Sequence, residues 1–248
     1  MEQGGLAIRG QMPMHSGLKA LFDLDGTLIT MWPIHEKAYE ATIRELYGIP
    51  GANFRKYYTP GGTNEDTVRQ TLKGLGFSEE MAEEKIHMVV PTLKRYYLEH
   101  IDGSGITVLP GVLPLLEELR SRDATIGIVT GNVTEVCSLI LESAGLSKYF
   151  EFIIGGDTEP SRYRRLASGA RRAGTTTSRT YYFDDSYASI PISRDLGIVS
   201  VAVGTGDTKY EKLAQENPDY LFRDLSDTRK VLEEVFGKNA QTQKKVPR

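Results

Sequence analysis

The stretch Leu21-Phe22-Asp23-Leu24-Asp25-Gly26-Thr27-Leu28 decides the fold of this chain. An apolar run that begins at Leu18 ends here in two carboxylates one residue apart, and a glycine and a threonine follow at once. Such a run is typical of a buried strand, and Asp-x-Asp-Gly-Thr is typical of the turn that leaves it. Because side chains alternate along an extended segment, Asp23 and Asp25 are expected to point in different directions. One acid can then face a substrate while the other serves a second role. The alternative is an ordinary acidic turn.

The composition is that of a soluble globular protein with one large domain or two moderate ones. The chain has 248 residues, 40% of them hydrophobic and 25% charged, and its formal net charge is −3. This weak charge gives no reason to expect a nucleic acid or an anionic membrane as a partner, and the oligomeric state stays open. We expect neither a membrane span nor a signal peptide, because no apolar run has the required character. The single cysteine, Cys137, fits a reducing cytoplasm, and its helical surroundings predict a buried packing role.

A helical pattern occupies residues 30–106, directly after the opening turn. Pro33 is suited to start a first helix, which the Gly-Ile-Pro-Gly segment at 48–51 ends. A second helix is expected after the loop 58–64, and a serine cap predicts a third helix over 78–98.

This helical block predicts a division of the chain into two domains. An all-helical segment placed directly after a strand with two carboxylates is expected to be a cap domain, residues 30–106. It would be inserted into an α/β core domain formed by 18–29 and 107–237. Residues 1–17 and 238–248 are expected to be a flexible lead-in and a flexible tail.

The rest of the chain alternates between strand and helix patterns, which predicts an α/β fold. Repeated alternation implies a Rossmann-like parallel sheet with helices on both faces, here with an inserted all-helical cap. In such sheets ligands bind beyond the carboxyl ends of the strands. After the opening strand, further strands are expected at 124–129, 150–154, 180–183, 198–203 and 219–222, and helices at 110–122, 132–144, 161–173, 186–196, 209–215 and 225–236.

Two of these strands end in residues that suit a phosphate and a metal ion. Thr130-Gly131-Asn132 offers a hydroxyl beside the amides of an incoming helix, although Asn132 is also a good helix cap. Asp184 and Asp185 follow one another at the end of a buried strand, where two acids are costly without a cation. With Asp23 they can form the carboxylate set that Mg²⁺ prefers. The alternative is an exposed acidic turn.

Together these segments resemble the haloacid dehalogenase-like (HAD) phosphohydrolases. The opening octet is similar to the first signature of that family, Thr130-Gly131-Asn132 to the second, and Asp184-Asp185 to the fourth. The resemblance covers about residues 18–236 and includes the cap insertion, as in the helical-cap phosphatases such as the phosphoglycolate phosphatases. It implies a Mg²⁺-dependent phosphatase that acts on a small phosphorylated metabolite.

The resemblance also implies a role for each site residue. Asp23 would be the nucleophile that forms an aspartyl-phosphate, and Asp25 the general acid and base. Mg²⁺ would bind Asp23, the Asp25 carbonyl and Asp185, with Asp184 as a further candidate. Thr130-Gly131-Asn132 would bind the substrate phosphate.

The cation that usually steadies the phosphate in this family, a lysine, is missing. In its place the chain has Arg162-Tyr163-Arg164-Arg165. Arg162, at the helix start, is the candidate replacement, with Arg164 and Arg165 as alternatives. A solvated basic helix face is the competing interpretation for all three. Tyr163 and Leu166 are expected to pack on the sheet.

Four further features of the sequence bear on the predicted site. Ser189 stands where the family usually has a second acid, so Asp184 is the expected substitute. His35 lies near the hinge of the predicted cap, where some relatives place a histidine that faces the substrate; a packing role is the alternative. The loop 61–63 resembles a cap segment that closes over substrate, although Gly-rich loops between helices are common. The segment 204–206 is interpreted as a plain turn, with part of the rim of the site as the alternative.

Two alternative functions stay open within the same fold. The acid at position 25 argues against dehalogenation, because true dehalogenases of the family lack an acid there. A sugar phosphomutase is one alternative to a phosphatase. A non-catalytic binding or regulatory relative is the other, because the usual lysine and second acid are absent.

Overall fold

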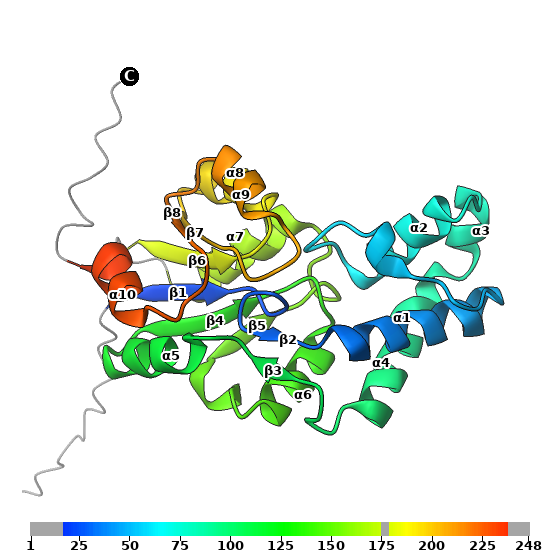
Figure 1. The fold of residues 1–248 in the computed structure, drawn as a ribbon, viewed down its shortest axis with the longest axis horizontal. Helices are drawn as coiled ribbons and strands as arrows, with labels where there is room; N and C mark the ends of the chain where they lie inside the picture. Colours follow the sequence, from blue (N-terminus) through cyan, green and yellow to red (C-terminus); the bar gives the residue numbers. More distant parts are fainter. Residues whose placement is uncertain (1–16, 175–178, 238–248) are drawn as a thin grey trace, which may run out of the picture.

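A six-stranded parallel sheet organises the part of the chain that the structure describes, residues 17–174 and 179–237 (Figure 1). In this computed structural model the strand order is β5-β4-β1-β6-β7-β8, and every neighbouring pair is parallel. The predicted α/β fold with a Rossmann-like sheet is therefore confirmed. Of the predicted flexible ends, all but Gly17 lie outside the described residues. The strands are β1 (Lys19–Phe22), β4 (Thr125–Val129), β5 (Phe152–Ile154), β6 (Thr180–Asp184), β7 (Val199–Val203) and β8 (Tyr220–Phe222).

The first strand of the chain lies at the centre of this sheet. In the β1 register, Phe22 stands opposite Ile128 of β4 on one side and Phe183 of β6 on the other. Parallel strands present their carboxyl ends at one edge of a sheet. The segments that follow β1, β4 and β6 are therefore brought together at that edge.

Helices cover both faces of the sheet, as the alternation of buried side chains requires. Ala20 and Phe22 pack into the hydrophobic cluster that includes α5, α6 and α10, while Leu21 points to the opposite face and packs with Leu166 of α7. Burial on both faces is typical of a parallel sheet. The helices are α5 (Val112–Ser121), α6 (Thr134–Ser143), α7 (Arg162–Arg172), α8 (Ser189–Asp195), α9 (Tyr210–Gln215) and α10 (Thr228–Phe236).

A helical insert, residues 31–106, extends from the sheet edge where the central strands end (Figure 1). It is joined to the rest through a short antiparallel pair, β2 (Ile29–Thr30) and β3 (Thr107–Val108), which the sequence pattern did not predict. One hydrophobic cluster continues from the sheet into the insert. The division into a separate core and cap domain stays a prediction. The helices of the insert are α1 (Trp32–Tyr47), α2 (Asn64–Gly74), α3 (Glu79–Glu84) and α4 (Val89–His100), with 3-10 turns at Phe54–Lys56 and Ile86–Met88.

The single helix predicted over 78–98 was wrong. The chain forms α3 and α4 with a 3-10 turn between them. Pro91 gives the physical reason, because it lacks a backbone N–H and its ring would clash with the carbonyl of residue 87 in a continuous helix. In the first turn of α4 the same proline is tolerated.

The helices that follow β4 and β6 both begin later than predicted. Helix α6 starts at Thr134 rather than 132, and Asn132 uses its side-chain oxygen to accept from the amide of Val133 (2.9 Å). Helix α8 starts at Ser189 rather than 186, because Ser186 donates its amide to Asp184 Oδ1 (2.8 Å) in a tight turn. Both extra loop segments lie at the sheet edge where the strands end.

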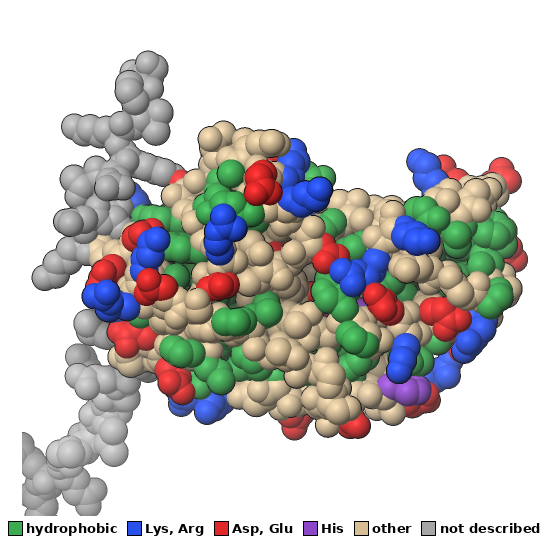
Figure 2. Space-filling model, in the orientation of Figure 1, with side chains coloured by type: hydrophobic (Ala, Val, Ile, Leu, Met, Phe, Trp, Pro, Cys, Tyr) green, Lys and Arg blue, Asp and Glu red, His purple; other side chains and the backbone are tan. Residues whose placement is uncertain are grey.

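The charged side chains and the single cysteine can be located in this fold. Figure 2 shows basic and acidic side chains interspersed over the face in view. Cys137 is a buried free cysteine, as predicted. Between residues 17 and 237, the gap at 175–178 aside, we find no helix with the length and apolar character needed to cross a membrane.

Candidate active site

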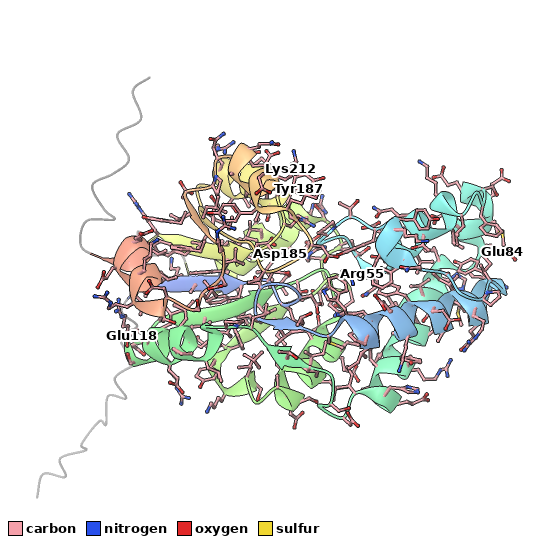
Figure 3. The ribbon with its side chains drawn as sticks, in the orientation of Figure 1. Arg55, Glu84, Glu118, Asp185, Tyr187 and Lys212 are labelled. Carbon is pink, nitrogen blue, oxygen red and sulfur yellow. The ribbon has the colours of Figure 1, made fainter. Side chains whose placement is uncertain are left out.

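Three carboxylates meet where the central strands of the sheet end. Asp23 directly follows β1, Asp184 is the last residue of β6, and Asp185 follows it. One ligand atom from each lies within 4.8 Å of those of the other two, and all three residues are buried. Figure 3 shows Asp185 at the edge of the sheet nearest the helical insert. The acids that the sequence assigned to a metal site thus lie together, while their role as ligands stays a prediction.

The electrostatics of this acidic cluster fit a divalent cation. Burial, and then the charges of Asp184, Asp185 and Asp25, hold the pKa of Asp23 well above its usual range. Burial followed by the Asp184 charge does the same to the pKa of Asp185. Oxygen atoms from clustered carboxylates are the donor set that Mg²⁺ takes. A cation would offset both the repulsion and the burial cost that raise these pKa values.

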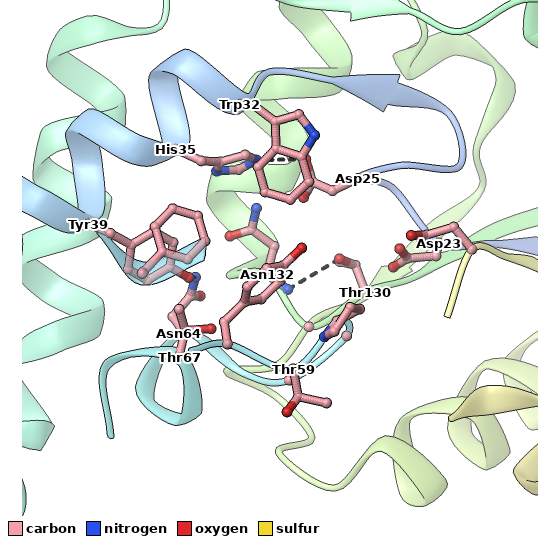
Figure 4. Close-up of a pocket in the computed structure, with 17 residues that line it drawn as sticks. Asp23, Asp25, Trp32, His35, Tyr39, Thr59, Asn64, Thr67, Thr130 and Asn132 are labelled. Atoms are coloured by element: carbon pink, nitrogen blue, oxygen red, sulfur yellow. Dashed lines mark hydrogen bonds and ion pairs between the residues drawn. The ribbon is translucent and has the colours of Figure 1, made fainter. Parts of the chain in front are cut away.

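Asp25 is directed towards the insert, into contact with His35. Its Oδ1 atom lies 2.7 Å from His35 Nε2 (Figure 4). The other imidazole nitrogen, Nδ1, lies 2.7 Å from the hydroxyl of Tyr97 on α4. Both His35 and Tyr97 are buried. The sequence placed His35 near the hinge but gave no sign of Tyr97, which reads there as one more apolar residue of α4.

The segment 204–206 contacts the turn that follows Asp25. Thr205 donates its hydroxyl to the carbonyl of Gly26 (2.5 Å), and Gly26 adopts a φ of +81°. A Cβ atom added at Gly206 would lie 1.7 Å from Asp185 Oδ2. The segment 204–206 forms a turn, as interpreted from the sequence. The segment supports the Asp25–Gly26 turn and packs directly against the acidic cluster.

The Thr130-Gly131-Asn132 segment follows β4 and lines a pocket that Asp23, Asp25 and Asp185 also line. The hydroxyl of Thr130 accepts from the amide of Asn132 (3.2 Å). Gly131 has no space for a side chain, because a Cβ atom there would lie 2.1 Å from the carbonyl oxygen of Gly62. The loop of the insert that contains Gly61 and Gly62 therefore packs directly against the end of β4. The sequence assigned this position to phosphate binding.

Two arginines of α7 lie behind that loop. Arg162 donates to the hydroxyl of Ser186 (2.8 Å) and to the carbonyl of Pro60. Arg165 is only 2% exposed and donates to the carbonyls of Pro160 (2.6 Å) and Gly61 (3.0 Å). Both arginines line a small cavity that Asp23, Thr130 and Asp184 also line. The structure thus offers two cations beside the proposed nucleophile.

The competing interpretation of a solvated basic helix face was wrong for Arg165. Helix α7 also presents a different set of side chains to the sheet from the set that was predicted. Tyr163 was expected to pack on the sheet but is 46% exposed, whereas Arg165 and Leu166 are buried. Arg164 is exposed, as a solvated residue would be. The apolar character of Tyr163 suggested the wrong helix face, and no pattern in the sequence reveals that an arginine will be buried by bonding to loop carbonyls.

Ser189 has a local role. Its hydroxyl is buried and donates to the carbonyl of Ser186 (2.8 Å). It does not belong to the group of clustered ligand atoms found among the described residues. Asp184 does belong to it, as expected of the substitute acid.

A pocket opens from the acids towards the insert (Figure 4). Its empty volume is about 630 Å³, part of it open to solvent. On the insert side of this pocket the sequence suggested only His35 and the loop 61–63, and it missed the other lining residues. The signal that could have found this side is the spacing of Trp32, His35 and Tyr39, which places three ring side chains on one face of α1. Besides these three, the insert contributes Phe54, Tyr58, Thr59, Pro60, Gly61, Gly62, Asn64 and Thr67.

The sequence of the chain is similar to those of known proteins. Residues 20–203 match the sequence family described as haloacid dehalogenase-like hydrolase. A phosphoglycolate phosphatase of Salmonella paratyphi A is 28% identical over 225 residues, which cover 83% of this chain and 88% of that protein. A phosphoglycolate phosphatase of Pseudomonas savastanoi pv. phaseolicola is 27% identical over 213 residues, covering 83% of this chain and 76% of that protein.

Solved structures show the same fold. A predicted phosphoglycolate phosphatase from Haemophilus somnus superposes with a TM-score of 0.69 at 21% identity, covering 88% of this chain and 99% of that chain. A beta-phosphoglucomutase from Clostridium difficile gives a TM-score of 0.66 at 19% identity, with 87% and 96% covered. At such identities the likeness concerns the fold alone.

Proposed function

The chain belongs to the haloacid dehalogenase-like hydrolases, and from that membership we propose that it is a phosphatase for a small phosphorylated metabolite. The observation that carries the proposal is the arrangement around Asp23. This buried acid lies beside the carboxylates of Asp184 and Asp185. It lines a small cavity together with Arg162 and Arg165. Asp25 follows two residues later, in the turn that leaves β1. The relatives named phosphoglycolate phosphatase support the choice of a phosphate ester as substrate class.

In the proposed reaction Asp23 is the nucleophile and Asp25 transfers protons. A carboxylate oxygen of Asp23 attacks phosphorus in line with the leaving oxygen, so that an aspartyl-phosphate forms as the ester P–O bond breaks. Protonated Asp25 gives its proton to the leaving oxygen, which departs as an alcohol. In the second step the Asp25 carboxylate takes a proton from water, whose oxygen attacks phosphorus. Inorganic phosphate leaves, and Asp23 and protonated Asp25 are restored.

Other residues of the chain would hold the phosphoryl group during these steps. The oxygens of Asp23, Asp184 and Asp185 would bind Mg²⁺, which supplies positive charge to phosphoryl oxygens when bound. The hydroxyl of Thr130 lines both cavities that meet at Asp23, within the region where a phosphoryl oxygen would lie. Arg162 lines the smaller cavity and can add a fixed positive charge there.

The contact of Asp25 with His35 suits both protonation states that this reaction requires. When Asp25 is a carboxylate, a neutral His35 with its proton on Nε2 donates to it, and Tyr97 donates to Nδ1. When Asp25 is a carboxylic acid, the other tautomer of His35 accepts from it and donates from Nδ1 to the Tyr97 oxygen. The chain of hydrogen bonds reverses its direction, and both imidazole nitrogens keep a partner in either state.

Mg²⁺-dependent hydrolysis of a generic phosphomonoester tests the proposal. We expect p-nitrophenyl phosphate to be hydrolysed only with Mg²⁺, and Asp23→Asn to abolish hydrolysis. Asp195→Asn makes the same chemical change at an exposed position of α8 and is expected to retain activity. Hydrolysis that is independent of Mg²⁺, or equal rates in wild type and Asp23→Asn, would contradict the proposal.

A further inference from the structure

The leaving-group side of the pocket holds one imidazole, that of His35, whose two nitrogens face Asp25 and Tyr97. Among the described residues that line this pocket, none is a lysine or an arginine. Arg55 comes close, with Cζ at 4.2 Å from the centroid of the Trp32 ring, but it is not a lining residue. Its charge is also paired, because its guanidinium lies 3.0 Å from Asp207 and 3.4 Å from Glu36. Figure 3 shows Arg55 on the insert side of the boundary with the sheet.

The arginines of the site lie on the phosphoryl side instead. Arg162 and Arg165 line the small cavity with Asp23, and their guanidinium groups bond to carbonyls of the loop at Pro60 and Gly61. That loop stands between these arginines and the larger pocket. A second anionic group on the substrate, outside the phosphate, would therefore face Asp25 without a lysine or an arginine beside it. Burying an unpaired charge near a like charge is strongly unfavourable.

Apart from His35 and the acids at the strand ends, the walls of the pocket are uncharged and of two kinds. Trp32 and Phe54 supply an aromatic surface, with their ring centroids 6.3 Å apart. Across the pocket lie the amide of Asn64 and the hydroxyl of Thr59 (Figure 4). Burial raises the pKa of Tyr39 to about 12, so its hydroxyl is neutral and accepts from Asn64 Nδ2 at 2.7 Å. An apolar ring surface facing uncharged donors and acceptors complements a flat molecule that carries hydroxyl groups.

We propose that the substrate is the phosphate ester of an uncharged, hydroxylated ring compound such as a sugar, and that phosphorylated carboxylic acids are poor substrates. This inference rests on the proposed phosphatase function and narrows it. It sets the chain apart from relatives whose names contain phosphoglycolate, such as the Salmonella and Pseudomonas proteins, because that compound places a carboxylate next to the phosphate ester. Specificity would then come from the absence of a cation, which penalises the anionic competitor.

A matched pair of substrates tests the charge preference. Phosphoglycolate and 2-hydroxyethyl phosphate have the same carbon skeleton and differ in carrying a carboxylate or a hydroxymethyl group. We expect the wild-type protein to show a kcat/KM at least tenfold higher for 2-hydroxyethyl phosphate. Thr59→Lys adds a cation at an exposed lining position and is expected to shift this ratio at least fivefold towards phosphoglycolate. Leu98→Lys adds the same charge on the exposed side of α4 and is expected to leave the ratio unchanged.

A second pair tests the ring surface. Ribose 5-phosphate and ribitol 5-phosphate present similar hydroxyl groups, but only the first can close into a ring. We expect at least a fivefold preference for ribose 5-phosphate, which Trp32→Leu removes. Circular dichroism checks that this variant is folded, and Trp32→Phe, which keeps an aromatic face, is expected to retain most of the preference.

Failure of this inference is distinguishable from failure of the phosphatase function. A Mg²⁺- and Asp23-dependent activity that prefers phosphoglycolate would overturn the charge preference and leave the phosphatase function intact. Equal rates on the two pentose phosphates would overturn the ring preference in the same way. Absence of Asp23-dependent hydrolysis with all four compounds and with p-nitrophenyl phosphate would overturn both proposals.

Discussion

Replacing Tyr97 by phenylalanine removes one oxygen atom from the hydrogen-bond chain that leads to Asp25. Tyr97 is 1% exposed and His35 is 6% exposed, so water does not readily replace the lost hydroxyl. One buried imidazole nitrogen is left without its partner, 2.7 Å away in the native structure. Leaving such a group unpaired costs about 1–3 kcal/mol. We expect a loss of this size in the free energy of unfolding, measured by urea denaturation.

The same substitution is expected to change kcat far more than KM. Tyr97 does not line the pocket among the described residues, so substrate binding keeps its contacts. His35 loses the bond that fixes its ring and tautomer, and Asp25 loses a correctly oriented partner. We expect kcat to fall about tenfold, which corresponds to about 1.4 kcal/mol in the activation free energy.

A neighbouring tyrosine provides the matched control for this prediction. Tyr96 lies on the same helix, stacks on His100 with ring centroids 4.0 Å apart, and does not line the pocket. Tyr96→Phe is expected to leave kcat and the free energy of unfolding within the error of wild type. If Tyr97→Phe loses stability but keeps a wild-type kcat, Tyr97 is a packing residue and the reasoning that connects it to Asp25 is refuted.

Three further predictions concern the phosphoryl side of the site. Arg162→Ala should lower kcat/KM at least tenfold, about 1.4 kcal/mol, while the exposed Arg164→Ala does not; steady-state kinetics of both variants decide this. Gly131→Ala should lower the free energy of unfolding by about 1–3 kcal/mol, because its Cβ would lie 2.1 Å from the Gly62 carbonyl; equal denaturation midpoints would contradict this. Because the folded-state pKa of Asp23 is raised, its stabilising contribution is complete below the unfolded pKa of about 4 and is lost as pH rises through the folded value. Without metal, Asp23→Asn should therefore raise the thermal midpoint at neutral pH more than in acid, and the midpoint shift caused by Mg²⁺ in wild type should grow with pH.

The sheet could be predicted from the sequence because its signals are local. Each strand is a short apolar run between turn residues, and the alternation with helices fixes a parallel sheet. The convergence of Asp23, Thr130 and Asp185 follows from this, since all three come directly after strands. Elements without a local signal were missed, as with the ribbon of β2 and β3, where each strand has only two residues.

Contacts between distant segments could not be predicted in the same way. His35 and Tyr97 stand on different helices of the insert, and only the packing of α1 against α4 brings them together. Arg165 is buried because loop carbonyls at residues 61 and 160 satisfy its guanidinium, which no helix pattern reveals. The residue that breaks the predicted helix, Pro91, was visible in the sequence and was overlooked.

Trapping the phosphorylated intermediate tests the central claim most directly. Asp25→Asn removes the base for the second step, so that a phosphoryl group transferred to Asp23 would persist. After incubation with Mg²⁺ and an activated substrate such as p-nitrophenyl phosphate, the protein is quenched in acid and its peptides are mapped by mass spectrometry. We predict one phosphoryl group on the peptide that contains Asp23, and none in the Asp23→Asn/Asp25→Asn double variant. A phosphoryl group on another residue, or p-nitrophenol release without any phosphorylated peptide, would contradict the account.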